Sequence, residues 1–348
     1  MILAASVLFL AAQSGLYEED PLATMRVRVD NWKQIEAYAA ALPASPAPAR
    51  RPAQGNEAAR IRAALLSQLG YPPPGFHAQV KERLEKSGED HTAIYHRCRI
   101  EVAQGMDAYG LYIVPKNRRG RAPLVISCHG GGGFPEMATF QGGANYHDMV
   151  RGAVAAGYAV YAPLAVMYPY RDRDHGTAIP EKVRGELDAV LRTKGTSLVA
   201  VEMAKLSKAL DALLKRPEID PARVGMVGLS FGGAYTVYAA ALDPRIRAAV
   251  ASCSFRDRSG QPAGPGGPPA GVTPGELAAL IAPRPLQVQA GRKDKLIPVD
   301  SVRAAAAAAR ERYAGNESRF AYEEFDGGHE FRGAPAWAFL EKHLRGEK

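Results

Sequence analysis

The side chains best suited to chemistry in this sequence are a serine, a histidine and an aspartate that lie far apart along the chain. Ser230 stands in Gly-Leu-Ser-Phe-Gly, between an apolar run and a helix-like segment. A serine hydroxyl is a weak nucleophile unless a positioned base removes its proton. His329 is the candidate base, because it follows the last strand-like run and precedes the final predicted helix. Asp294, just past an earlier strand-like run, is the candidate acid that would orient the imidazole.

Two other aspartates compete for the role of the acid. Asp300 directly precedes the alanine-rich segment SVRAAAAAAR, so it suits the N-terminal region of a helix and ranks second. Asp326 lies only three positions before His329 and ranks third. Asp294 therefore remains the first choice.

The glycines on either side of Ser230 have a steric interpretation. A sharp turn from strand to helix holds the serine in a strained conformation and leaves no room for a Cβ atom at positions 228 and 232. The dipole of the following helix would favour negative charge near the serine. The alternative is a tight turn of small residues with no chemical role.

A second glycine-rich segment, CHGGGGF at residues 128–134, suits the stabilisation of a developing oxyanion. Acyl transfer places negative charge on the former carbonyl oxygen, and backbone N–H groups must already point toward it. We expect one donor from Phe231, the residue after the serine, and the other from Gly131, with Gly132 as second choice. A flexible loop or a phosphate cradle are the alternatives, but the Gly-Lys-Ser/Thr ending of a phosphate loop is missing.

The elements that must position these residues follow from the apolar periodicity. From about residue 91 the sequence gives two paired strands joined by a turn near Gly105, and then strands that alternate with helices. Continuous apolar strands of this kind indicate a mostly parallel sheet with helices on both faces and an antiparallel start. The carboxyl ends of parallel strands share one crevice, where Ser230, Asp294 and His329 would meet.

The motifs HGGGG, GLSFGG, IAPRPLQVQAGRKDKLIPVD and DGGHEF, in this order, resemble the α/β-hydrolase superfamily. The most similar group is that of dienelactone-hydrolase-like and acetyl-xylan-esterase-like bacterial serine esterases. The resemblance covers about residues 91–345 and implies a sheet of about eight strands and ester hydrolysis through an acyl-enzyme. It also matches Ser230 to the nucleophile, His329 to the base and Asp294 to the acid. Dienelactone hydrolases proper use a cysteine nucleophile, so their substrate does not carry over.

Three segments organise the chain. Residues 1–14 form an apolar run that ends in small residues, which predicts a signal peptide and a secreted or periplasmic protein, with a cytoplasmic location as the alternative. Residues 15–90 form an arm with a Pro/Ala-rich linker and one amphipathic helix that stops at Gly70. Residues 91–348 form the α/β-hydrolase domain.

Composition limits the range of partners. The 348 residues carry a net charge of +8 that is scattered along the chain, with a short basic cluster at residues 117–121 that suits a solvated hairpin tip better than a nucleic-acid site. The first apolar run is too short to span a bilayer. The three cysteines form no metal or disulfide spacing and are expected to be buried. We predict no cofactor, no metal, no nucleic acid and no membrane span, and leave the oligomeric state open.

The segment 167–195 leaves the end of a strand and would overhang the site. Its Tyr170, Arg171 and His175 are candidate substrate-binding residues for a sugar ring, a hydroxyl group or a carboxylate. A solvated loop whose charges pair among themselves explains them equally well.

The sequence therefore predicts a serine hydrolase that cleaves carboxylic esters with short acyl groups, acetylated carbohydrate among them, through a Ser-His-Asp triad. A peptidase of the same fold is one alternative, although residues 1–90 are too short for the large gating domain that such peptidases carry. A non-catalytic binding protein is the other, and it would be expected to lack part of the triad.

Overall fold

The computed structural model of the chain describes residues 15–20, 24–45, 55–140, 145–165, 181–258 and 272–346. The predicted signal peptide at residues 1–14 lies outside these residues, as do the candidate substrate residues Tyr170, Arg171 and His175. In the described ranges, no helix has both the length and the apolar character needed to cross a membrane.

Nine strands of the described chain form one mixed sheet in the order β1-β2-β3-β5-β4-β6-β7-β8-β9. The pairs from β1 to β5 are antiparallel and the pairs from β5 to β9 are parallel. The predicted mixed sheet with an antiparallel start is confirmed. The strands are β1 (Glu82–Glu89), β2 (Ala93–Ala103), β3 (Met106–Pro115), β4 (Ala122–Cys128), β5 (Ala159–Pro163), β6 (Ile219–Leu229), β7 (Ala248–Ser252), β8 (Leu286–Gly291) and β9 (Phe320–Phe325).

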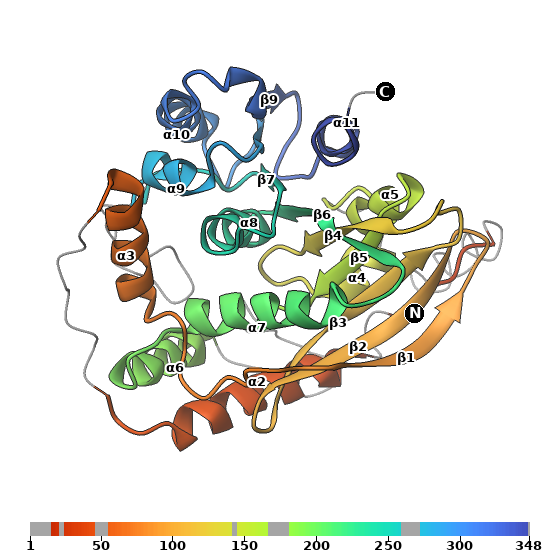
Figure 1. The fold of residues 1–348 in the computed structure, drawn as a ribbon, viewed down its shortest axis with the longest axis vertical. Coiled ribbons are helices and arrows are strands. Elements are labelled where there is room, and N and C mark those ends of the chain that lie inside the picture. The colour runs from red at the N-terminus through yellow and green to blue at the C-terminus, as the bar shows by residue number, and fades with distance from the viewer. Residues whose placement is uncertain are drawn as a thin grey trace.

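Helices cover both faces of the sheet, as predicted (Figure 1). Helices α7 and α8 pack on one face, and α5 and α11 on the other. The helices are α2 (Met25–Ala41), α3 (Glu57–Leu69), α4 (Pro135–Phe140), α5 (Met149–Ala155), α6 (Glu181–Thr193), α7 (Leu198–Leu213), α8 (Phe231–Leu242), α9 (Pro274–Ile281), α10 (Val299–Glu311) and α11 (Gly333–Arg345), with a short 3₁₀ helix at Glu317–Arg319.

The sheet separates two apolar cores, and its central strands supply both. In β4, Leu124 and Ile126 belong to the core under α7 and α8, whereas Val125 belongs to the core under α5 and α11. Successive side chains of a strand point to opposite faces, so a strand buried on both faces must be apolar throughout. This burial explains why the central strands appear in the sequence as continuous apolar runs.

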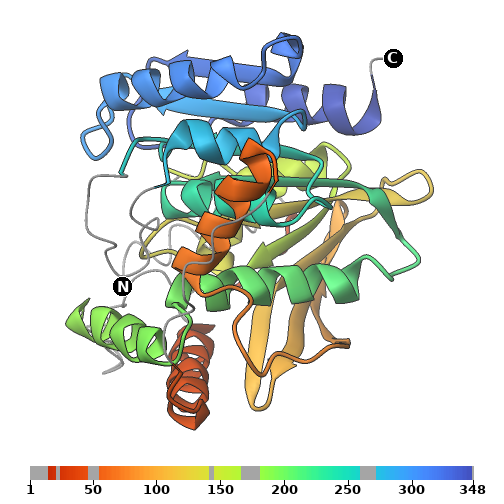
Figure 2. The same ribbon diagram turned by 60° about the vertical axis from the view of Figure 1, so that its left-hand side comes forward.

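The region before residue 91 contributes more than an arm. Strand β1 pairs with β2 and extends the sheet at its antiparallel edge. Helix α2 buries Trp32 and Ile35 in the larger core, and Figure 2 shows it beside α6 while α3 lies beside α9. Helix α3 begins at Asn56, whose side chain accepts from the Ala59 N–H, and stops at Gly70 as predicted.

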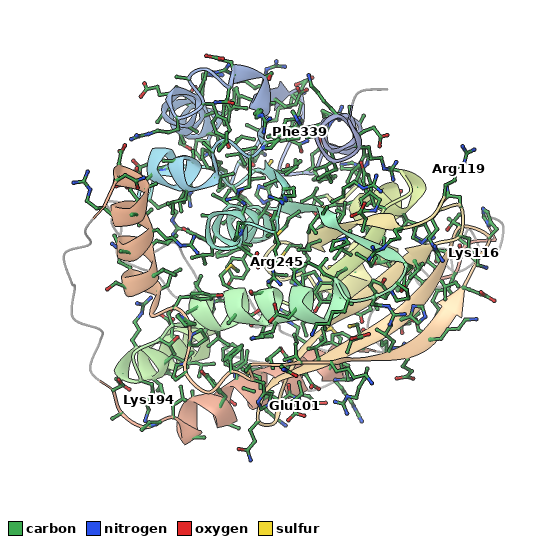
Figure 3. All side chains as sticks on the ribbon, in the orientation of Figure 1. Glu101, Lys116, Arg119, Lys194, Arg245 and Phe339 are labelled. Atoms are coloured by element: carbon green, nitrogen blue, oxygen red, sulfur yellow. The ribbon has the colours of Figure 1, made fainter. Side chains whose placement is uncertain are left out.

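The basic cluster at residues 117–121 is exposed, but it is not the tip of a hairpin. It connects β3 to β4, and β5 lies between these two strands in the sheet. Figure 3 shows the neighbouring Lys116 and Arg119 at the edge of the molecule. The cluster precedes the start of β4, whereas Ser230 follows the end of the parallel strand β6. The expectation of a hairpin was wrong because β3 and β4, although consecutive in the sequence, do not pair with each other in the sheet.

Candidate active site

Ser230 occupies a sharp turn between β6 and α8. Its backbone has φ 58° and ψ −122°, a conformation that side-chain-bearing residues rarely adopt. Two hydrogen bonds hold this turn: the Ser230 N–H donates to the Ser252 carbonyl at 2.8 Å, and the Ser230 carbonyl accepts from Ala234 at 3.0 Å. Strain of this kind costs about 1–3 kcal/mol and is concentrated at functional sites.

The flanking glycines are required for steric reasons, as predicted. A Cβ atom on Gly228 would collide with the Gly232 carbonyl, and one on Gly232 would collide with the Cys128 carbonyl at the end of β4. The turn is therefore pressed against the neighbouring strand. Any larger residue at either position would displace Ser230.

Asp294 and His329 form a direct hydrogen bond. His329 Nδ1 lies 2.8 Å from Asp294 Oδ2. The other carboxylate oxygen, Oδ1, accepts from the Leu296 and Ile297 N–H groups at 2.8 and 2.9 Å. Because a carboxylate can only accept, Nδ1 must be the protonated nitrogen, which leaves Nε2 of the neutral imidazole to take a proton.

The two competing aspartates lie elsewhere. Asp300 is in the first turn of α10, as its sequence context suggested, and pairs with Arg303. Asp326 pairs with Lys293 at 2.9 Å, and its side chain is 66% exposed. Within the described residues, neither carboxylate forms a hydrogen bond or an ion pair with His329.

Ser230 lies at the strand end next to this pair but forms no hydrogen bond with His329 in the described part of the chain. In the register of the sheet, Leu229 pairs with Ser252, and Ser252 pairs with Gln289 of β8. Catalytic hydrogen bonds are often long in the absence of substrate. The sheet thus brings Asp294 and His329 into contact and places the Ser230 turn at the same end.

Cys253, for which only burial was predicted, lies between these elements. Its thiol, the Asp294 carboxylate and the His329 imidazole have ligand atoms within 4.8 Å of one another. A metal ion at this cluster would need a thiolate, but burial raises the pKa of the Cys253 thiol to about 11. Both Asp294 oxygens already accept hydrogen bonds. The cluster suits a proton-handling pair better than a metal site, and all three cysteines are buried as predicted.

The glycine segment after β4 is a tight turn with two N–H groups left to donate. The Gly130 N–H already donates to the Tyr146 hydroxyl at 3.0 Å, and Gly133 donates to the Gly130 carbonyl at 3.2 Å. The N–H groups of Gly131 and Gly132 donate to no atom of the described residues. Gly130 also lies close to Ser230, because a Cβ atom added to Gly130 would lie 3.4 Å from the Ser230 Cβ.

Phe231, the third predicted donor, begins α8, so its backbone N–H belongs to the first turn of that helix. The helix dipole favours negative charge at this end. Tyr146, which fixes Gly130, could not have been found from sequence, because its partner is a backbone group.

His129 anchors the glycine turn as a neutral residue. Its Nδ1 donates to the Gly130 carbonyl at 2.8 Å, and its Nε2 accepts from the Ala165 N–H at 3.1 Å. The side chain is 1% exposed, and burial lowers its pKa from 6.5 to about 3. In the unfolded chain the imidazole takes up a proton near 6.5, whereas the folded protein excludes that proton until about pH 3.

The stability that His129 contributes is therefore complete above about pH 6.5 and is lost as the pH falls. We expect the stability advantage of the native protein over His129→Gln to fall by about 1.4 kcal/mol per pH unit within this window. Urea unfolding near neutral pH and near pH 5 measures it. His91→Gln, at an exposed position, is the matched control, and an advantage that stays constant with pH would contradict the prediction.

An apolar cavity borders Ser230 on the side of α8 and α9. Arg256 and Arg258 contribute cationic groups to its wall. Its apolar lining consists of Phe231, Ala234, Val237, Tyr238, Phe255, Val272, Pro274, Leu277 and Ile297. A ligand bound there would place its apolar portion next to the serine hydroxyl.

Comparison with known proteins places this chain in a described family. The model of the dienelactone hydrolase family matches residues 110–332, which is more than half of the chain. "Putative hydrolase YtaP" of Bacillus subtilis (strain 168) is 26% identical over 205 residues, which cover 55% of this chain and 67% of that protein.

Two solved structures share the fold. The glucuronoyl esterase from Solibacter usitatus has a TM-score of 0.59 and 17% identity, over 87% of this chain and 99% of the other. Acetyl xylan esterase 1 from Thermoanaerobacterium sp. JW/SL YS485 has a TM-score of 0.55 and 18% identity, over 91% and 98% of the two chains. At these identities the likeness concerns the fold.

Proposed function

Since this chain belongs to the dienelactone hydrolase family and is a carboxylic ester hydrolase, we propose that it is a serine esterase with Ser230 as nucleophile, His329 as base and Asp294 as acid. The observation that carries this proposal is the hydrogen bond from His329 Nδ1 to Asp294 Oδ2, at the strand end next to the Ser230 turn. It fixes the imidazole tautomer that a serine nucleophile requires.

In this mechanism the Ser230 Oγ attacks the ester carbonyl carbon while His329 Nε2 takes the hydroxyl proton. The carbonyl oxygen becomes an oxyanion that accepts hydrogen bonds from Phe231 and Gly131, with Gly132 as the second choice for the loop donor. Asp294 stabilises the imidazolium that forms. His329 then donates its proton to the alcohol oxygen as the C–O bond breaks, and water hydrolyses the acyl-enzyme by the same steps.

The proposed substrates are esters of short acyl groups, with acetylated carbohydrate as one class. The apolar cavity formed by Val237, Phe255 and Leu277 would take the hydrocarbon part of the acyl group. The names of the structural neighbours, among them an acetyl xylan esterase and a glucuronoyl esterase, support carbohydrate esters as the first substrates to test.

A fluorophosphonate probe tests the nucleophile, and an ester panel tests the reaction. We expect one probe molecule per chain, attached to Ser230 by peptide mapping. We also expect turnover of p-nitrophenyl acetate that falls as the acyl chain lengthens, release of acetate from acetylated xylan, and no turnover of p-nitroacetanilide. An unlabelled Ser230 together with no ester turnover would overturn the proposal, and faster cleavage of the anilide would favour a peptidase.

A further inference from the structure

The glycine turn after β4 has no side chains of its own to hold it, so its shape must be fixed from outside. Glycine residues lose more conformational freedom on folding than any others. The contacts of His129 and Tyr146 hold Gly130, and the turn hydrogen bond ties Gly133 back to it. The Gly130 carbonyl shares a planar peptide unit with the Gly131 N–H, so these contacts also orient that N–H group. They leave the next peptide unit, which carries the Gly132 N–H, to another partner.

That partner comes from the N-terminal helix. Arg28 of α2 donates from Nη1 to the Gly132 carbonyl at 3.2 Å, across 104 positions of sequence. Its side chain is buried, with 2% of the residue exposed. Helix α2 also lies outside residues 110–332, the part that the dienelactone hydrolase family shares. The contact therefore joins a helix outside the matched residues to a turn inside them.

Helix α2 is itself rigidly docked, so it can act as a support. Asn31, one turn after Arg28, donates to the Asp107 carbonyl at 2.7 Å and accepts from the Lys205 ammonium at 2.7 Å. Lys205 in turn pairs with the buried Glu202 of α7 at 3.1 Å. The next residue, Trp32, is buried in the larger core. These contacts hold the helix against β3 and α7, and they fix the origin of the Arg28 side chain.

We propose that Arg28 is a positioning residue for the oxyanion donors, which deepens the proposed function and rests on it. The Gly132 carbonyl belongs to the peptide unit that directly follows the one carrying the Gly132 N–H. Fixing that carbonyl therefore restricts the rotation that would turn the Gly132 N–H away from the reacting carbonyl. Gly132 has φ 75°, a region in which glycine meets little resistance to rotation. Without the guanidinium, Gly130 and Gly133 keep their hydrogen bonds, but the Gly132 N–H loses its fixed orientation.

Replacement of Arg28 tests the proposal with a matched control in the same arm. Arg62 of α3 also donates to backbone carbonyls, those of Ala241 and Leu242 at 3.0 and 2.9 Å, but these lie at the far end of α8. For Arg28→Ala we expect kcat for p-nitrophenyl acetate to fall about 10- to 100-fold with KM unchanged. The rate of Ser230 phosphonylation should fall in parallel, because the phosphonyl oxygen uses the same donors. For Arg62→Ala we expect unchanged kcat.

Two further variants keep the test decisive. Arg28→Lys retains a charged donor and is expected to recover part of kcat, and Arg28→Gln removes the charge with less loss of volume if Arg28→Ala does not fold. Native kcat in folded Arg28→Ala or Arg28→Gln would overturn the proposal, as would an equal loss in Arg62→Ala. Ser230→Ala distinguishes failure of the proposed function from failure of the Arg28 proposal. If Ser230→Ala retains turnover, Ser230 is not the nucleophile, whatever the result for the Arg28 variants.

Discussion

Replacement of Ser230 by alanine is expected to lower kcat/KM for p-nitrophenyl acetate by about 10⁴- to 10⁶-fold. Without the hydroxyl no acyl-enzyme can form, and only the oxyanion donors and substrate binding remain to accelerate direct attack by water. The variant should fold normally, because the hydrogen bonds of the turn come from the backbone of Ser230. Initial rates with p-nitrophenyl acetate and thermal unfolding measure the two effects.

Ser254→Ala is the matched control for this experiment. Ser254 lines the same cavity as Ser230, but it follows β7 and has no place in the proposed proton transfer. We expect its turnover to stay within about three-fold of the native value. Residual activity above a few per cent in Ser230→Ala, or an equal loss in Ser254→Ala, would show that the hydroxyl of Ser230 is not the nucleophile.

The core of the fold could be predicted because the parallel strands are buried on both faces. Strands such as β4 and β6 carry uninterrupted apolar runs, and helices separate them. Strand β1 has no such pattern: its sequence ERLEKSGE is mostly charged, and it lies at the edge of the sheet with no side chain fully buried. Only pairing with β2 makes it a strand, and that pairing is a tertiary property. The strand order, with β5 between β3 and β4, also could not be predicted from the sequence.

The candidate triad could be predicted for a related reason. Ser230, Asp294 and His329 each follow a recognisable strand, and parallel strands present their carboxyl ends at one edge. The residues that hold the glycine turn in place could not be predicted. Arg28 and Tyr146 act on the backbone of the glycine turn, and a carbonyl or an N–H group exists at every residue, so no pattern marks the position that needs a partner. Cys253 was predicted only to be buried, and its place beside His329 depends on the register of β7 and β8.

Asp294→Asn is expected to lower kcat by about 10⁴-fold while the fold is preserved. The hydrogen bonds of Asp294 give the reason. Its Oδ1 accepts from two backbone N–H groups, so the amide oxygen of asparagine must stay at that position. The amide NH₂ then faces His329 Nδ1, where the carboxylate oxygen was. Two donors cannot bond to each other, so Nδ1 gives up its proton and Nε2 carries it instead. In that tautomer Nε2 cannot accept the Ser230 proton.

The competing aspartates supply the controls, because each was a candidate for the same role. Asp300→Asn and Asp326→Asn each remove an exposed carboxylate that pairs with a surface cation, Arg303 in the first case and Lys293 in the second. Exposed pairs contribute at most about 1 kcal/mol to stability, and we expect both variants to keep turnover within about two-fold of native. Steady-state kinetics on the three variants, each shown to be folded by circular dichroism, decide between the candidates. If Asp326→Asn loses turnover while Asp294→Asn keeps it, the acid is Asp326. Loss of activity in Asp294→Asn alone would instead tie catalysis to the carboxylate that holds the His329 tautomer.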